Sequence, residues 1–400
     1  EQYRHIKTGA RVLKLAAPHD DHKVFCIAFR TPPADDTGCA HIIEHSVLCG
    51  SRRYRTKEPF LDLLKGSLAT FLNAFTYASH TLYPVASRNA RDFAILTDVY
   101  LDAVFHPRVV DDLPQAFLQE GWHLHDISGD VDEKEKDDEN KDKEEQESQQ
   151  KEYNKEESES GSDDESYEGF EYKGVVYNEM RGAYSDPEAV LASAVQTALF
   201  PDTAYRHESG GVPAAIPTLS YADFVARYRR CYHPSNSCTV LYGDGDTAAE
   251  LAHLDRYFAE YAPADCPLPD VALQAPFDAP VTVQRTYPVV AASAEEGKGS
   301  KDSKEKEEEE NRWYYSVSWQ VGQAAATSAE DAALFLVVLP VLDWLLVRRE
   351  GAVLKEAVLK AGLARSVTSH LELDVKQPYY TVTAAHARAD SLAAFVALVE

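Results

Sequence analysis

The segment His41–His45 constrains this chain more than any other, because it reads H-x-x-E-H. On an α-helix, His41 and His45 stand at positions i and i+4, so both imidazoles leave the same face one turn apart. This geometry suits two nitrogen ligands on one Zn²⁺ ion. Glu44 projects close to that face, where it can reach a water molecule on the metal. The motif therefore predicts a zinc-bearing helix with a carboxylate beside the metal.

The residues on either side of the motif favour a helix. Asp35, Asp36 and Thr37 offer caps for its first turn, and Gly50 is a natural stop after its last turn. We therefore expect a short helix that begins just after these polar residues and ends before Gly50.

The net charge of −26 is concentrated in one part of the 400-residue chain. Residues 130–168 hold 19 Asp and Glu and 6 Lys, which gives 19 − 6 = 13 negative charges and therefore half of the total. This tract has almost no aliphatic side chains, so it cannot bury enough surface to offset chain entropy and is expected to be a disordered insertion. Nucleic acid is excluded as a partner, because the chain lacks a basic face.

Neither a disulfide framework nor a membrane span is visible. The six cysteines form no C-x-x-C pair, which fits a reducing compartment. The longest apolar run, residues 332–347, is interrupted by Pro340 and Asp343 and is too short to span a bilayer. No signal peptide is visible. The chain lacks an initiator Met and stops inside an apolar, helix-like run, so we expect it to be a piece of a longer protein.

The apolar patterns predict an α+β fold of antiparallel strands and helices. Two hairpins are expected, one from residues 11–15 and 23–29 and one from residues 71–76 and 81–85. Residues 174–177 read as a further strand. Helices are expected to begin near residues 58 and 185, to span about 90–105, 113–122 and 221–230, and to end near residue 261.

The order of these patterns divides the chain into two units. Residues 1–261 are expected to form the zinc-bearing domain, and residues 262–311 a linker with a charged low-complexity tract. Residues 312–400 repeat the order strand, helix, helix, but apolar side chains replace the zinc motif. We therefore expect a second, metal-free homologous domain that is only partly present.

Two histidines leave Zn²⁺ short of a ligand, because a catalytic site uses three protein ligands and keeps one open position. Glu179 is the best candidate, since it lies on a structured segment after the apolar run. Glu171 and Glu188 are alternatives. His123 and His125 are possible as well, although they alternate like ordinary strand histidines.

Six blocks of sequence together resemble the presequence protease branch of the pitrilysin (inverzincin) metalloproteases. They cover most of residues 1–261 and read HIIEHSVLCGSRRY, FLNAFTYASHTLYPVAS, VYLDAVFHP, QEGWH, GVVYNEMRGAYSD and HPSN. The resemblance implies that His41, His45 and Glu179 bind one zinc ion per chain and that Glu44 is the general base. It also implies two related pitrilysin/processing-peptidase-like domains, each an antiparallel sheet with helices packed on it.

The same resemblance implies a zinc-dependent endopeptidase that degrades unfolded peptides such as cleaved targeting presequences. Asn73, Ala74, Phe75 and Thr76 would form the edge strand to which an extended peptide adds. The C-terminal half of the same protein, which this sequence does not contain, would close a chamber around the substrate. The implied location is the mitochondrial matrix, with a plastid-like organelle or the cytosol as alternatives.

Three other functions stay open at this point. A non-catalytic core or scaffold subunit of the same fold usually loses residues of the H-x-x-E-H motif, and all of them are present here. The catalytic subunit of the processing peptidase keeps the motif, but the continuation SVLCGS resembles presequence protease instead. An iron-dependent lyase of the LuxS type uses the same motif in a far smaller protein.

Overall fold

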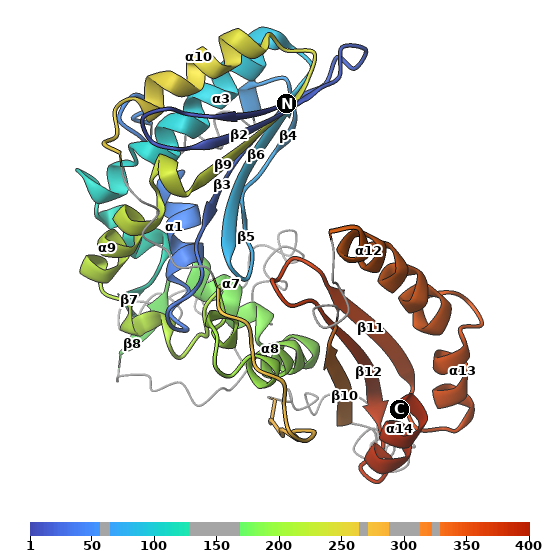
Figure 1. Cartoon of the computed structure of the whole chain (residues 1–400). Coiled ribbons are helices and arrows are strands. Elements are labelled where there is room, and N and C mark those ends of the chain that lie inside the picture. Colours follow the sequence, from blue (N-terminus) through green and yellow to red (C-terminus); the bar gives the residue numbers. More distant parts are fainter. Residues whose placement is uncertain (57–64, 128–168, 264–270, 288–312, 322–328) are drawn as a thin grey trace, which may run out of the picture.

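The computed structural model describes residues 1–56, 65–127, 169–263, 271–287, 313–321 and 329–400 (Figure 1). The helix expected near residue 58, the acidic insertion at 130–168 and most of the linker with its charged tract lie outside these ranges. Among the described residues, no helix combines the length and the apolar character that a membrane crossing requires.

A seven-stranded sheet forms the N-terminal part of the molecule. Its strands follow the order β1-β2-β9-β3-β6-β4, and the short β5 also pairs with β6. Neighbouring strands are antiparallel except β2 and β9, which are parallel. The strands are β1 (Gln2–Arg4), β2 (Arg11–Ala16), β3 (Lys23–Arg30), β4 (Ala69–Leu72), β5 (Phe75–Thr76), β6 (His80–Ser87) and β9 (Ser237–Gly243).

The expected hairpin of residues 11–15 and 23–29 is wrong, although both strands exist. β9 lies between them, so that Leu13 pairs with Val240 and Ile27 pairs with Thr239. A partner strand from so far along the chain leaves no local signal in the sequence. The second predicted hairpin is present, because β4 and β5 both pair with β6.

Helices cover this sheet and surround the H-x-x-E-H segment. α1 contacts α4, α7 and α9, while α3 packs against β3, β6 and α10 (Figure 1). The helices are α1 (Cys39–Val47), α3 (Ala90–Phe105), α4 (Gln115–Glu120), α7 (Val175–Ala183), α8 (Pro187–Leu199), α9 (Tyr221–Cys231) and α10 (Thr247–Phe258). Short 3-10 turns lie at η1 (Arg108–Val110), η3 (Ala204–Arg206), η4 (Ile216–Thr218) and η5 (Pro234–Asn236), and β7 (His123–Asp126) pairs with β8 (Phe170–Lys173).

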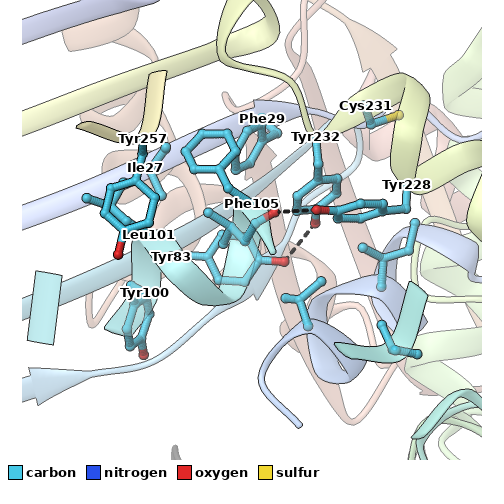
Figure 2. Packing of buried hydrophobic residues seen from close by; sticks show 14 of the residues in the cluster. Ile27, Phe29, Tyr83, Tyr100, Leu101, Phe105, Tyr228, Cys231, Tyr232 and Tyr257 are labelled. Carbon is cyan, nitrogen blue, oxygen red and sulfur yellow. Dashed lines mark hydrogen bonds between the residues drawn. The ribbon is translucent and has the colours of Figure 1, made fainter. Parts of the chain in front are cut away.

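The core of this part is rich in aromatic side chains. Along β3 every second residue is buried, which places Phe25, Ile27 and Phe29 in the interior. Figure 2 shows Phe29 beside Tyr232, and the two rings stack with centroids 4.5 Å apart. The hydroxyls of Tyr83 and Tyr232 lie 2.7 Å apart in a buried hydrogen bond, so neither polar group is left unsatisfied. This core supports the sheet whose strand β5 contacts the site described below.

A separate three-stranded antiparallel sheet, in the order β10-β12-β11, lies toward the C-terminus. It has its own core, to which Val358 and Phe395 contribute fully buried side chains. Its elements are β10 (Trp313–Gln320), α12 (Ala329–Asp343), the π-helical η6 (Trp344–Arg348), α13 (Val353–Lys360), β11 (Ser366–Glu372), β12 (Tyr379–Ala387) and α14 (Leu392–Val399). The predicted order strand, helix, helix is present, and the predicted α+β fold is confirmed.

A small apolar cluster joins the two sheets. α8 lies along β10, and the residues after it pack against the second sheet (Figure 1). Phe200 and Tyr205 contact Val375 and Tyr379 there, with Leu199 beside them. The segment after α7 therefore connects the neighbourhood of the H-x-x-E-H helix with the C-terminal sheet.

Candidate metal centre

α1 holds the two motif histidines as the spacing predicts. The rings of His41 and His45 lie with centroids 4.8 Å apart and an interplanar angle of 83°. His41 is 9% exposed, and Ile42 and Ile43 between the histidines are fully buried. The helix is thus anchored in the core on one side and presents both imidazoles on another.

The predicted side-chain cap of this helix is wrong. α1 begins after Gly38, which has a left-handed φ of 66°, and no side chain caps its first turn. Asp35 instead accepts a hydrogen bond from the backbone N–H of Thr37 at 3.0 Å. Asp36 bonds to a distant loop, as described below. The polar residues before α1 therefore stabilise the segment that leads into the helix, and they do not cap its first turn.

Glu179 reaches the histidines from a helix, whereas residues 174–177 were expected to be a strand. β8 ends at Lys173 and α7 begins at Val175. Val176 and Tyr177 are buried, and the side chain of Glu179 is about half exposed on another face. The Val-Val-Tyr run has the composition of a strand, but Val176 and Tyr177 are adjacent and both buried, which the alternation of a half-buried strand does not give. They belong to a helix that packs against α1 and α4.

The three predicted ligands converge. Glu179 Oε2 lies 3.7 Å from His41 Nε2 and 3.8 Å from His45 Nε2. One candidate ligand atom from each residue lies within 4.8 Å of the other two. These residues come from two helices that are far apart in sequence, so the convergence is a property of the fold and not of the motif alone.

Hydrogen bonds fix which ring nitrogen each histidine offers. Nδ1 of His41 lies 3.2 Å from the carbonyl oxygen of Gly210, which can only accept, so Nδ1 carries the proton. Nδ1 of His45 lies 3.4 Å from Oε2 of Glu120. In both neutral imidazoles, the lone pair is therefore on Nε2 and faces Glu179.

This donor set fits Zn²⁺. Two Nε2 lone pairs and a carboxylate oxygen face one another with no proton between them, and a cation is the group that such an arrangement lacks. Ligand atoms at about 2.0–2.2 Å around a tetrahedral zinc lie roughly 3.4 Å apart, close to the spacings of 3.7 and 3.8 Å. Three protein ligands also leave one position for water.

Glu120 is a residue that the sequence reasoning missed. It lies at the end of α4, is 8% exposed, and accepts hydrogen bonds from Cys49 Sγ at 3.4 Å and Gln119 Nε2 at 2.9 Å. Burial opposes its charge, but the bonds from His45 and Cys49 lower the pKa of Glu120 overall. For His45 burial is likewise the opposing effect, and Glu120 with the neighbouring carboxylates raises its pKa. One feature of the sequence could have indicated this role: Glu120 lies on the face of α4 that is otherwise formed by the apolar Ala116 and Phe117.

Glu44 sits next to the cluster and is held from the sheet. Its side chain is buried, and Oε2 accepts a hydrogen bond of 2.5 Å from the hydroxyl of Thr76 in β5. Burial raises the pKa of Glu44 above its ordinary value, and the Thr76 bond acts in the opposite direction. A buried carboxylate beside the candidate ligands is the placement that a proton acceptor for a water molecule requires.

The predicted substrate strand lies beside this carboxylate. Phe75 and Thr76 form β5, which pairs with β6 and has no strand on its other side among the described residues. Oδ1 of Asn73 accepts from the N–H of Ala74 at 2.9 Å, so this side chain is engaged with its own backbone. Phe71 stacks on Phe75 with centroids 6.3 Å apart.

The alternative ligands lie elsewhere. Glu171 forms an ion pair within β8, and Glu188 stands in the first turn of α8. His123 bonds a backbone carbonyl through Nδ1 at 2.9 Å, and His125 pairs with Glu171 across β7 and β8. None of these four residues belongs to the group formed by the motif histidines and Glu179.

One family model and several curated proteins match this sequence. A family model described as "Peptidase M16 inactive domain" matches residues 218–398. "Protein HypA" from Clostridium perfringens is 39% identical over 384 residues, which cover 95% of this chain and 33% of the relative. "Presequence protease 1, chloroplastic/mitochondrial" from Arabidopsis thaliana is 38% identical over 384 residues, covering 95% of this chain and 30% of the relative. "Presequence protease, mitochondrial" from Drosophila melanogaster is 39% identical over 256 residues, covering 64% of this chain and 21% of the relative.

Solved structures share the fold. Pitrilysin aligns with 98% of this chain and 34% of its own at a TM-score of 0.55 and 13% identity. A peptidase M16 inactive domain from Pseudomonas fluorescens aligns with 100% of this chain and 78% of its own at a TM-score of 0.61 and 11% identity. At these identities the likeness concerns the fold alone. The chain spans about a third or less of the length of the curated relatives reported above.

Proposed function

Because the chain belongs to the M16 family of peptidases and is similar to its presequence proteases, we propose that it is the zinc-bearing part of an endopeptidase for unfolded peptides. The observation that carries this proposal is the convergence of His41, His45 and Glu179 beside the buried carboxylate of Glu44. The resemblance supplied these roles, and the geometry supports them.

The chemistry follows from these positions. A zinc ion held by the three ligands would lower the pKa of a bound water to about 7 and would polarise the scissile carbonyl. Thr76 holds Oε2 of Glu44, which leaves Oε1 to take the proton of the attacking water. Glu44 then delivers that proton to the leaving amine. The buried setting of Glu44 keeps bulk water from competing for it.

The free edge of β5 would receive the substrate. An extended peptide that adds to this edge bonds through its backbone, which carries no sequence information. Because Thr76 belongs to β5 and holds Glu44, a bound peptide would be placed next to the proton acceptor. This supports unfolded peptides, including cleaved targeting presequences, as the substrate class. Phe71 is 46% exposed and stacks on the half-buried Phe75, and these two rings would contact apolar side chains of the peptide.

Further polypeptide of the same protein is part of the proposal. The curated relatives are about three times as long as the matched segment. α12 exposes Leu334, Val337 and Val341, each more than half exposed, which is the kind of surface that another part of a protein covers. We propose that the C-terminal remainder closes a chamber over the site. Two relatives are named as organellar proteases, so we propose a mitochondrial or plastid-like location, the matrix first.

The scaffold function is the second candidate. The family model that matches residues 218–398 is described as inactive. However, His41, His45 and Glu179 all precede the matched residues, so the description does not extend to the candidate centre. We therefore propose the catalytic role for the N-terminal part, which holds these residues, and no catalytic role for the C-terminal sheet.

A cleavage assay on the full-length protein separates the two candidates. An unstructured fluorogenic peptide should be cleaved, a chelator should abolish cleavage, and added zinc should restore it. Glu44→Gln should lower kcat by roughly 10²–10⁴-fold, because it removes the proton acceptor. It should keep its zinc.

Glu188→Gln is the matched control, since Glu188 lies in the first turn of α8 outside the candidate centre. It should cleave like the wild type. Zinc-loaded wild-type protein that cleaves no peptide would instead support the scaffold function.

A further inference from the structure

A loop crosses the start of the H-x-x-E-H helix and contacts one of its histidines. Residues 207–212, here called the strap, run between η3 and η4. The carbonyl oxygen of Gly210 in the strap accepts the Nδ1 proton of His41 at 3.2 Å. No side chain is needed for this contact, and the sequence alone gave no indication of it.

One carboxylate ties the strap to the segment before α1. Oδ1 of Asp36 accepts the N–H of Glu208 at 2.9 Å, and Oδ2 lies 3.2 Å from Nδ1 of His207. The backbone carbonyl of Asp36 accepts the N–H of Val212 at 2.8 Å. Asp36 therefore contacts the strap on both sides of Gly210.

The packing leaves the strap no room to shift toward α1. A Cβ on Gly38 would lie 2.5 Å from the carbonyl oxygen of Gly210, and a Cβ on Gly211 would lie 2.9 Å from Cα of Gly38. Gly211 also has a left-handed φ of 101°. A Cβ on Gly210 would meet the Met180 side chain at 2.9 Å, next to Glu179. The strap thus touches both helices that carry the candidate ligands.

We propose that the strap is a positioning element for His41, and that Asp36 is its anchor. The Gly210 carbonyl holds the proton on Nδ1, so Nε2 is the atom turned toward Glu179. Partners of this kind set the tautomer and orientation of metal-ligating histidines. The inference rests on the proposed function only in taking His41 as a ligand; the tautomer itself is a property of the metal-free chain.

The first test is the tautomer of His41. Nitrogen-15 NMR of the imidazole rings, recorded on metal-free protein at pH 8.5, should show His41 as the Nδ1–H tautomer in the wild type. Asp36→Ala should release the strap and add a population of the Nε2–H tautomer. His45 is the internal control, because Glu120 and not the strap faces its Nδ1.

The matched control variant is Asp35→Ala, because the wild-type Asp35 carboxylate bonds Thr37 and not the strap. It should leave His41 unchanged. If Asp36→Ala fails to fold, His207→Ala removes one contact of the anchor and should shift the same population to a smaller extent. A His41 ring that stays entirely in the Nδ1–H form in the folded anchor variant overturns the proposal.

The second test is zinc affinity measured by competition with a chromogenic chelator. Asp36→Ala should weaken it about tenfold, the lower end of the effect of losing a histidine's outer partner, and Asp35→Ala should not. A wild-type chain that binds no zinc would defeat the proposed function while the tautomer result still decides on the strap. If the wild type binds zinc, unchanged affinity in folded Asp36→Ala would by itself contradict the positioning role.

Discussion

At the scale of single residues, the site is defined by what holds its two imidazoles. Each one gives its Nδ1 proton to an acceptor on a different element, the Gly210 carbonyl for His41 and Glu120 for His45. Both Nε2 atoms are thereby turned toward Glu179. The motif identifies the histidines, whereas their orientation depends on groups far away in sequence.

Glu120 provides a prediction at this scale. Glu120→Gln keeps the shape of the side chain and removes the charge that faces His45. We expect zinc affinity to fall by about tenfold, because outer partners of this kind contribute 10–100-fold. Chelator competition measures it, with Gln115→Ala, at an exposed position of the same helix, as the control. Equal affinity in Glu120→Gln and the wild type would show that the carboxylate has no part in binding.

The residues that sequence reasoning could supply were those with a spacing or a resemblance behind them. The H-x-x-E-H spacing predicted His41, Glu44 and His45, and the position of Glu179 made it the best of several candidates for the third ligand. The family resemblance then implied the same four residues. Glu120, Asp36 and Gly210 carry no such pattern, because their roles arise only when distant segments fold together. A backbone carbonyl in particular has no sequence signature.

At the scale of elements, the periodicity of apolar residues predicted helices and strands better than residue composition did. α3 begins and ends at the predicted residues, since its apolar side chains follow a helical period over several turns and Asn89 caps it. The short Val-Val-Tyr run before Glu179 has strand composition and became the first turn of α7. The predicted hairpin of β2 and β3 failed because β9 lies between the two strands.

An ion-pair network between α3 and α10 gives a prediction for acid stability. Burial opposes the charge of Asp98, but bonds from Tyr54, His253 and Tyr257, together with Arg53, lower its pKa from 3.8 to about 2. A carboxylate whose folded-state pKa is lowered stabilises the fold above its unfolded pKa and loses that contribution as pH falls toward the folded value.

We therefore expect Asp98→Asn to lower the free energy of unfolding at pH 7 by about 2 kcal/mol, since it leaves a largely buried network unpaired. The difference from the wild type should shrink between pH 4 and pH 2. Denaturant unfolding at pH 7 and pH 3 measures it, with the exposed Asp255→Asn as control. A difference that does not change with pH would contradict the assigned pKa.

At the scale of the whole molecule, two sheets share one chain and are joined through the region after α8. The strand order β10-β12-β11 repeats the order β3-β6-β4, and all these neighbours are antiparallel. Such a repeat is what a duplication would produce. The division at residues 261 and 312 and the duplication itself stay predictions, which superposition of the two sheets would test.

The segment between the candidate centre and the second sheet belongs to neither sheet. Tyr205 is buried, and its hydroxyl accepts the N–H of Lys376 at 2.9 Å and lies 3.3 Å from Ser79, next to the β5–β6 hairpin. The strap begins two residues after Tyr205. The second sheet is therefore connected through the Tyr205 hydroxyl to the hairpin that carries the proposed substrate strand, and the strap that holds His41 lies close to the same tyrosine in sequence.

The central claim is that His41, His45 and Glu179 bind one zinc ion, and metal analysis of ligand variants tests it most directly. Wild-type protein, dialysed against dilute zinc, should retain one zinc per chain, and zinc-edge X-ray absorption should show two imidazole nitrogens. Glu179→Ala should lose most of the metal under the same dialysis, while Glu171→Ala should retain it, because Glu171 lies in β8 outside the cluster. Stoichiometric zinc in Glu179→Ala with an unchanged absorption spectrum would contradict the account.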